Sequence, residues 1–193
     1  MRNLVVEGSY NVRDLGGYPT ADGQHTRWKV LVRAGNLDKV SAAGCQYITD
    51  YGIKTVIDLR DEWEVEDFPN VFAQSEQVRY VSLPLIGNRL SQDETWKAAG
   101  QTLFRLEELY GYYLDHCQTQ IGSIVAAISE STPGTIFHCY AGKDRTGLIA
   151  ALLLGAVGVS VEDIAEDYAQ TSQHITHLVA DWEEYAIRND YDM

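Results

Sequence analysis

A cysteine, an aspartate and an arginine lie close together in one stretch of the chain. It reads His138-Cys139-Tyr140-Ala141-Gly142-Lys143-Asp144-Arg145-Thr146-Gly147. An ionised thiol is a nucleophile, and a guanidinium can hold two oxygens of a phosphate in its planar fork. These residue types at this spacing predict that Cys139 attacks an anion such as a phosphate ester, and that Arg145 binds this anion.

Two apolar segments flank this stretch and must position it. Residues 135–138 are typical of a short buried strand, and residues 148–154 of a buried helix. A strand, a loop and a helix N-terminus in succession form an anion site, because unpaired amide N–H groups and the helix dipole point the same way. A cysteine in that field is expected to be a thiolate.

The spacing between Cys139 and Arg145 allows the backbone to curl around a tetrahedral anion. Gly142 permits the positive φ that such a curl often needs. We expect Thr146 to donate its hydroxyl to the Cys139 thiolate. The simpler alternative is a core cysteine at the end of a buried strand. If Cys139 is instead the nucleophile of an anion site, the anion is bound by the side chain of Arg145 and by the backbone of Tyr140, Ala141, Gly142 and Lys143.

The stretch from His138 to Gly147 resembles the signature loop of the cysteine-dependent protein tyrosine phosphatase superfamily. Three further segments resemble one branch of it, the bacterial and fungal tyrosine phosphatases, whose members often accept phosphotyrosine, phosphoserine/threonine and phosphoinositides. The segments are Asn11-Val12-Arg13-Asp14-Leu15-Gly16-Gly17, Arg33-Ala34-Gly35 and Ile57-Asp58-Leu59-Arg60. The resemblance covers roughly residues 8–170. It implies a phosphatase that needs no cofactor and no metal.

The resemblance also implies a role for each catalytic group. Cys139 forms a phosphocysteine intermediate that water hydrolyses, and Arg145 binds phosphate and stabilises the transition state. Asp144 is the implied general acid, because the Trp-Pro-Asp tripeptide that supplies this acid in many relatives does not occur in this chain. The flanking Lys143 and Arg145 favour its charged form, which a bound phosphate dianion would offset. Asp93 is the reserve candidate.

Several other polar residues are candidates for substrate binding or support. Lys143 is either a second cation for substrates such as phosphoinositides or a surface lysine. Arg13 and Asp14 either contact substrate or buttress the loop, the alternative being a turn stabilised by an aspartate side chain. We expect His138 to orient the loop by donating to backbone near the cysteine.

An acidic segment follows the predicted strand that ends at Asp58 and Arg60. We interpret Asp58 and Arg60 as a structural ion pair beside the site. The acidic residues after them are interpreted as a solvated helix face. They are Asp61, Glu62, Glu64, Glu66 and Asp67.

The composition is that of a globular protein: 193 residues, 45% hydrophobic, with a formal net charge of −13. This charge argues against general binding to nucleic acids or anionic membranes. The expected partners are therefore a phosphorylated protein, or a phosphoinositide or inositol phosphate, with inorganic phosphate as product. The three cysteines form no CxxC pair, which suits a reducing compartment, and no Cys/His cluster has zinc spacing.

No apolar segment of membrane-spanning length occurs. The first seven residues lack the apolar core of a signal peptide, and the apolar run 147–159 is too short to cross a bilayer. We expect a soluble cytoplasmic protein without membrane insertion. Export without a cleaved signal remains an open alternative.

Strands that alternate with helices predict an α/β fold with a mostly parallel central sheet, in one phosphatase domain over residues 1–193 with a possible helical cap within 86–132. The segments 33–35 and 58–60 and the residue Cys139 each follow a strand, so they should meet at one edge of the sheet. The predicted strands are 3–6, 28–33, 53–60, 78–85 and 135–138. The predicted helices are 41–51, 61–68, 96–117, 121–128, 148–157, 160–170 and 175–185, with loops at 11–19 and 86–95.

Two other functions remain open from the sequence. The first is a catalytically silent module that binds phosphate, although such modules usually lose one of the groups that Cys139, Asp144, Arg145 and Thr146 supply here. The second is another thiol reaction on an oxyanion loop, such as sulfur transfer or arsenate reduction. Turnover of a phosphate ester distinguishes both from a phosphatase.

Overall fold

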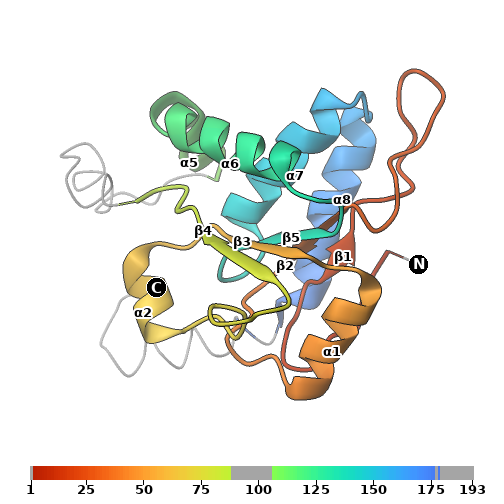
Figure 1. The fold of residues 1–193 in the computed structure, drawn as a ribbon. Helices are drawn as coiled ribbons and strands as arrows, with labels where there is room; N and C mark the ends of the chain where they lie inside the picture. The colour runs from red at the N-terminus through yellow and green to blue at the C-terminus, as the bar shows by residue number, and fades with distance from the viewer. Residues whose placement is uncertain (1, 88–105, 177, 179–193) are drawn as a thin grey trace.

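The fold is a five-stranded sheet covered by helices on both faces (Figure 1). A computed structural model describes residues 2–87, 106–176 and 178. The strand order is β1-β2-β5-β3-β4, with β1 antiparallel to β2 and all other pairs parallel. The strands are β1 (Arg13–Asp14), β2 (Leu31–Ala34), β3 (Thr55–Asp58), β4 (Arg79–Ser82) and β5 (Thr135–His138). The predicted α/β fold is confirmed.

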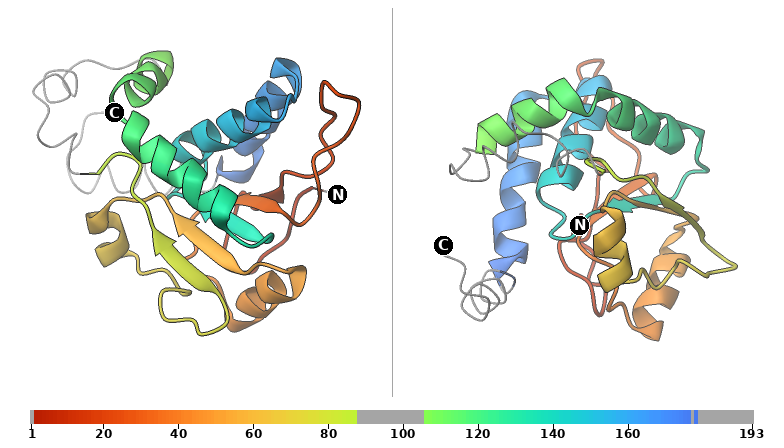
Figure 2. Two further views of the ribbon diagram at one scale, coloured as in Figure 1. Left: turned by 45° about the horizontal axis from the view of Figure 1, so that its top comes forward. Right: turned by 90° about the vertical axis from the view of Figure 1, so that its left-hand side faces the viewer.

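The helices form two layers, seen from several sides in Figures 1 and 2. The helices α1 and α2 lie on one side of the sheet, and α5, α6, α7 and α8 lie on the other. Their bounds are α1 (Ala42–Tyr51), α2 (Glu62–Asp67), α5 (Leu106–His116), α6 (Gln118–Glu130), α7 (Asp144–Ala156) and α8 (Val161–His174). None of the described helices combines the length and the apolar character that a membrane crossing requires.

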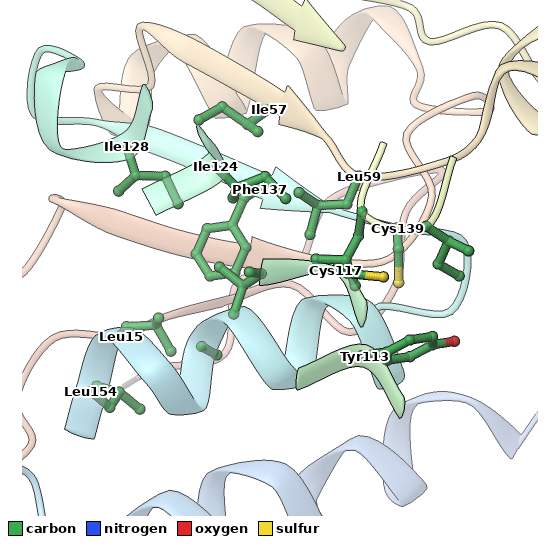
Figure 3. Packing of buried hydrophobic residues seen from close by; sticks show 14 of the residues in the cluster. Leu15, Ile57, Leu59, Tyr113, Cys117, Ile124, Ile128, Phe137, Cys139 and Leu154 are labelled. Atoms are coloured by element: carbon green, nitrogen blue, oxygen red, sulfur yellow. The ribbon is translucent and has the colours of Figure 1, made fainter. Parts of the chain in front are cut away.

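The buried strands divide their side chains between the two layers. Val56 and Ile136 belong to the core cluster shared with α1, whereas Ile57 and Phe137 belong to the cluster shared with α6 and α7 (Figure 3). All four side chains are fully buried. Because successive strand residues face opposite ways, a strand covered on both sides reads as a continuous apolar run. This pattern explains why β3 and β5 were recognisable in the sequence.

Two features of the N-terminal region differ from the prediction. Residues 3–6 form no strand, and only an isolated bridge joins Asn3 to Arg13. The predicted loop 11–19 instead contains β1, whose register pairs Arg13 with Arg33. Polar residues concealed this strand, because its two side chains are charged and nevertheless fully buried. The strand β2 also starts later than predicted, after a turn in which Lys29 has a φ of 61°.

The helix boundaries follow local capping residues, close to the predicted ends. The Ser41 side chain accepts a hydrogen bond from the Gly44 amide, and Gly52 ends α1 with a φ of 111°. The Ser160 side chain likewise accepts from the Asp163 amide at the start of α8. The predicted positions of Asp93, of helix residues 96–105 and of most of helix 175–185 lie outside the described residues.

Candidate active site

Cys139 lies at the carboxyl end of β5, the middle strand of the sheet. The register pairs His138 with Ala34 on one side and with Asp58 on the other. Three strand ends therefore meet at Cys139, as the sequence predicted. The helix α7 begins at Asp144, so a loop of four residues, 140–143, connects strand and helix. The Cys139 side chain is buried within the cluster shown in Figure 3.

The carbonyl groups of this loop all bond away from its centre. The amide N–H groups of residues 141–143 face the opposite way, because each trans peptide holds its N–H antiparallel to the preceding carbonyl. No described residue accepts a hydrogen bond from these amides. They are the N–H groups that an anion would use. The Tyr140 carbonyl accepts hydrogen bonds from Asn36 N (2.8 Å) and Tyr10 Oη (2.7 Å). The Ala141 carbonyl accepts from Asn11 Nδ2 (3.1 Å). The Gly142 carbonyl accepts from Asn11 Nδ2 (3.0 Å) and from Arg33 Nη2 (2.8 Å).

Gly142 is required by its position in this loop. Its φ is 66°, and a Cβ there would lie 2.4 Å from the carbonyl oxygen of Ala34. A side chain at this position would strain the backbone and displace the neighbouring strand end. The glycine that the motif places inside the loop thus allows the curl and the close approach of β2.

A buried charge cluster holds the outer side of the loop. Asp167 of α8 pairs with Arg13 Nε at 2.8 Å and with an Nη of Arg33. Arg13 also binds the Asn11 side chain, and both Asn11 and Arg33 bond to the Gly142 carbonyl. Arg13 is fully buried, so it supports the loop and does not reach substrate. Burial and the Arg13 charge lower the pKa of Arg33 to about 10, which leaves it charged at neutral pH.

We expect the Asp167→Asn variant to have a free energy of unfolding about 3–5 kcal/mol lower at pH 7. In this variant Arg13 and Arg33 remain buried without a counter-charge. Burial would raise the pKa of Asp167, but Arg33 and Arg13 hold it below its usual value. The carboxylate therefore stabilises the fold above about pH 4, and this contribution is lost as the pH falls further. Urea unfolding of the variant and of the unaltered protein at several pH values measures this. If their free energies of unfolding differed by the same amount at pH 7 and at pH 3, the prediction would be contradicted.

The Asp14 side chain bonds to residues outside the loop 140–143. It is fully buried, and its carboxylate accepts hydrogen bonds from Gly16 N (2.6 Å), Lys29 N (2.8 Å) and Tyr51 Oη (2.6 Å). These contacts tie β1 to the turn before β2 and to α1. The alternative of a turn stabilised by an aspartate side chain fits these contacts.

Arg145 is held by a carboxylate from α2. Its Nη1 and Nη2 bind both oxygens of Glu64, with Nη2 2.7 Å from Oε1, and Asp61 lies 3.9 Å away. Burial alone would lower the pKa of Arg145, but Glu64 and the neighbouring Cys139 raise it above its usual value. Glu64 takes one N–H of each Nη, so Nε and the second N–H of an Nη are left to bind an anion.

The sequence interpretation of Glu64 was wrong. Glu64 is buried and does not belong to a solvated helix face. Its Oε2 also accepts a hydrogen bond from the Asp61 amide at 2.9 Å, in the manner of a capping box. The pattern Asp61-x-x-Glu64 could have indicated that Glu64 is not solvated, because in a capping box the glutamate side chain turns back toward the helix N-terminus.

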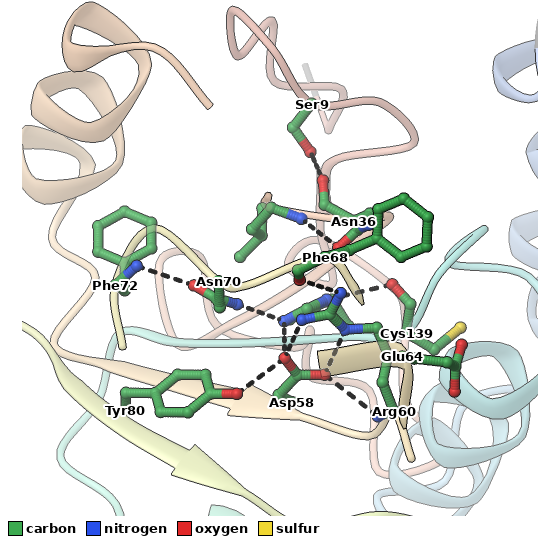
Figure 4. Close-up of polar contacts among 12 residues, drawn as sticks. Ser9, Asn36, Asp58, Arg60, Glu64, Phe68, Asn70, Phe72, Tyr80 and Cys139 are labelled. Carbon is green, nitrogen blue, oxygen red and sulfur yellow. Dashed lines mark hydrogen bonds and ion pairs between the residues drawn. The ribbon is translucent and has the colours of Figure 1, made fainter. Parts of the chain in front are cut away.

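A second buried network lies behind Cys139 (Figure 4). Arg60 binds Asp58 through Nε (2.9 Å) and Nη2 (2.6 Å) and donates from Nη1 to the Phe68 carbonyl at 2.8 Å. This last bond ties the end of β3 to the end of α2, which carries Glu64. Burial would raise the pKa of Asp58, but His138 and Arg60 hold it well below its usual range. Asp58 and Arg60 thus form the ion pair beside the site that the sequence suggested.

His138 connects this network to the cysteine. Its Nδ1 lies 3.1 Å from the Cys139 carbonyl oxygen, and its Nε2 lies 2.9 Å from Asn70 Nδ2 and 3.3 Å from Asp58. A proton on Nδ1 lets the ring donate to the Cys139 carbonyl, while its Nε2 side is held between Asn70 and Asp58. This is the arrangement expected of an orienting residue.

Asp144 lies at the N-terminus of α7, with its side chain partly exposed. Tyr110 Oη lies 2.7 Å from Asp144 Oδ1, and Lys143 Nζ lies 3.9 Å from the same oxygen. No sequence pattern indicated that Tyr110, which lies on α5 and 34 positions earlier, would contact Asp144. The hydrogen bond expected between Thr146 and Cys139 is not formed; the buried Thr146 hydroxyl has no partner in the described part of the chain.

No cluster of three or more His, Cys, Asp or Glu side chains that could hold a metal occurs among the described residues. The loop 140–143, in which the amides of residues 141–143 have no acceptor among the described residues, directly follows Cys139, and the Arg145 guanidinium lies near this cysteine. Such a site can bind a tetrahedral oxyanion and attack its central atom. The structure brings together Cys139, the loop 140–143, Asp144 and Arg145, and it adds Glu64.

Comparison with known proteins gives consistent matches. The model of the tyrosine phosphatase family matches residues 4–192. The chain is 32% identical over 177 residues to a Cupriavidus necator protein named as a tyrosine-protein phosphatase, which covers 89% of this chain and 63% of that protein. It is 31% identical over 157 residues to a tyrosine-protein phosphatase of Nostoc commune, covering 81% and 53%. It is 25% identical over 201 residues to the triple specificity protein phosphatase PtpB of Mycobacterium tuberculosis, covering 91% and 71%. The chain thus spans between half and two thirds of the first two relatives.

Proposed function

The chain belongs to the tyrosine phosphatase family, and on this basis we propose that it hydrolyses phosphate monoesters, phosphotyrosine in proteins first among them. The observation that carries this proposal is the position of Cys139 under a loop whose carbonyls all bond outward. The loop amides and Arg145 bind the three non-bridging oxygens of the phosphate, which places phosphorus above the sulfur.

The proposed reaction has two steps. The Cys139 thiolate attacks phosphorus, the S–P bond forms, and the bond from phosphorus to the ester oxygen breaks. Asp144 gives its proton to the departing oxygen. Water then attacks the phosphorus of the phosphocysteine, Asp144 takes a proton from this water, and the S–P bond breaks, which releases inorganic phosphate and regenerates the Cys139 thiolate. Arg145 stabilises the charge on the equatorial oxygens in both steps.

Phosphoserine, phosphothreonine and phosphoinositides are further proposed substrates. The name of the Mycobacterium tuberculosis relative includes triple specificity. The Lys143 side chain is 31% exposed beside the loop, where its ammonium could meet a second phosphate. A reducing compartment such as the cytoplasm suits the mechanism, because Cys139 must stay reduced to act as the nucleophile.

The test of the proposed function is hydrolysis of p-nitrophenyl phosphate in the presence of a chelator and a thiol reductant. Metal-independent turnover is the expected result, followed by a panel of phosphotyrosine and phosphoserine peptides and inositol phosphates. Binding of phosphate without turnover would identify a silent binding module. Arsenate-dependent oxidation of thiols without phosphatase activity would identify an arsenate reductase.

We expect the Asp144→Asn variant to lose activity in proportion to the leaving group's need for a proton. The value of kcat/KM for phenyl phosphate should fall by about 10²–10³-fold. The value for p-nitrophenyl phosphate should fall less than about tenfold, because p-nitrophenolate leaves readily without protonation. Steady-state kinetics on both esters measures this.

The matched control is Asp50→Asn, an exposed aspartate on α1 that should leave both values unchanged. Equal losses on the two esters would show that Asp144 is not the general acid. The assignment would then pass to another carboxylate, for which Asp61, beside Arg145, and the reserve Asp93 are the candidates.

A further inference from the structure

Two tyrosines from different helices converge on the carboxylate of Asp144. Tyr110 of α5 lies 2.7 Å from Asp144 Oδ1, and the hydroxyls of Tyr110 and Tyr168, which lies on α8, are 2.6 Å apart. The Tyr168 hydroxyl also lies within hydrogen-bonding reach of the Asp144 carboxylate. The two phenols therefore hold this carboxylate beside the loop.

The direction of this chain follows from its members. An ionised carboxylate only accepts hydrogen bonds, so Tyr110 donates its proton to Asp144. The Tyr110 oxygen then accepts from Tyr168, and both phenol protons point toward Oδ1. Burial, the largest cause in each case, raises the pKa of Tyr110 and of Tyr168. Both phenols therefore keep their protons at neutral pH.

Packing fixes the two rings in this arrangement. They meet edge to face, with centroids 6.1 Å apart and an interplanar angle of 89°. The ring of Tyr168 also lies against Gly147, where a Cβ would come within 2.9 Å of a ring carbon. Gly147 lies three residues after Asp144 on α7, so the glycine allows Tyr168 to approach the start of that helix.

We propose that Tyr110, backed by Tyr168, is a positioning residue for proton transfer by Asp144. This inference rests on the proposed phosphatase function and on Asp144 as its general acid. The Tyr110 hydrogen bond strengthens as Asp144 gives up its proton and becomes charged. It therefore stabilises the transition state more than the ground state, and it does so most for esters whose leaving oxygen needs protonation.

The test compares Tyr110→Phe with the unaltered protein on phenyl phosphate and p-nitrophenyl phosphate. The value of kcat/KM reports formation of the phosphocysteine, which is the step that includes the leaving group. We expect about a tenfold loss on phenyl phosphate and less than about a twofold loss on p-nitrophenyl phosphate. Tyr168→Phe should show the same selectivity at about a threefold loss.

Two controls separate positioning from packing. Tyr112→Phe, on the same helix and stacked on His116, should leave the ratio of the two esters unchanged. In an Asp144→Asn background, Tyr110→Phe should cause no further loss on phenyl phosphate, because the two residues act through one proton transfer. Thermal unfolding of each variant reports any change in stability.

Each remaining outcome has a defined meaning. An equal loss on both esters, or a full additional loss in the Asp144→Asn background, would overturn the positioning role while the phosphatase function stands. An inert unaltered protein would overturn the proposed function and this inference together. No loss on either ester in Tyr110→Phe would show that the hydrogen bond contributes nothing to the reaction.

Discussion

The Cys139→Ser variant is expected to lose at least about 10⁴-fold in kcat on p-nitrophenyl phosphate. A thiol is a much stronger acid than a serine hydroxyl, which would need a general base to act as the nucleophile at this position. His138 does not supply that base, because its ring faces the Cys139 carbonyl and Asp58. Serine therefore keeps the shape of the site but removes its nucleophile.

Phosphate binding should survive this substitution. The loop amides and Arg145 remain in place, so inorganic phosphate should still protect Cys139→Ser against thermal unfolding. Cys45→Ser is the matched control, since Cys45 packs with the cluster on the α1 side of the sheet and should keep full activity. Acid quenching of the unaltered protein during turnover should trap a phosphorylated Cys139. Substantial turnover by Cys139→Ser would show that the nucleophile lies elsewhere.

The Arg145→Lys variant is expected to lose about 10³-fold in kcat/KM. The ammonium carries the same charge, but it cannot bind Glu64 and two phosphate oxygens at the same time. Oxyanion donors act most strongly in the transition state, so kcat should fall by more than KM rises. The same substitution at the exposed Arg27 is the matched control and should change neither value.

Glu64 orients the Arg145 guanidinium, so a substitution at Glu64 is a second test of the role of Arg145. The Glu64→Gln variant keeps one hydrogen-bond acceptor and loses the charge that pairs with the guanidinium. Its loss should be smaller than that of Arg145→Lys, at about 10–100-fold. Full activity in Arg145→Lys would show that the net charge alone binds phosphate, with no need for the planar fork.

The central loop could be predicted because its information is contiguous. One run of ten residues contains the end of a strand, the curl with its glycine and the start of a helix. Each of these depends on local backbone preferences, so Cys139, Gly142 and Arg145 could be assigned without knowing what surrounds them. The same holds for the buried strands β3 and β5, whose apolar runs indicate burial on both sides.

Charged residues far apart in the sequence could not be assigned in this way. Arg13 and Asp167 are separated by 154 positions, and nothing in either segment indicates the other. Substrate contact and support of the loop were both open for Arg13 from the sequence, and the packing of α8 against β1 buries this side chain. A local pattern cannot reveal the burial of a charge, because its cost is offset by a partner that only the fold supplies.

The sequence by itself determined the chemistry of the loop and the layered α/β fold. It did not determine which of five acidic residues in segment 61–67 meets Arg145, or that Tyr110 and Tyr168 reach Asp144. Those contacts depend on which faces of α2, α5 and α8 turn toward the start of α7. Strand and loop formation follow from neighbouring residues, whereas the pairing of side chains follows from the packing of whole helices on the sheet.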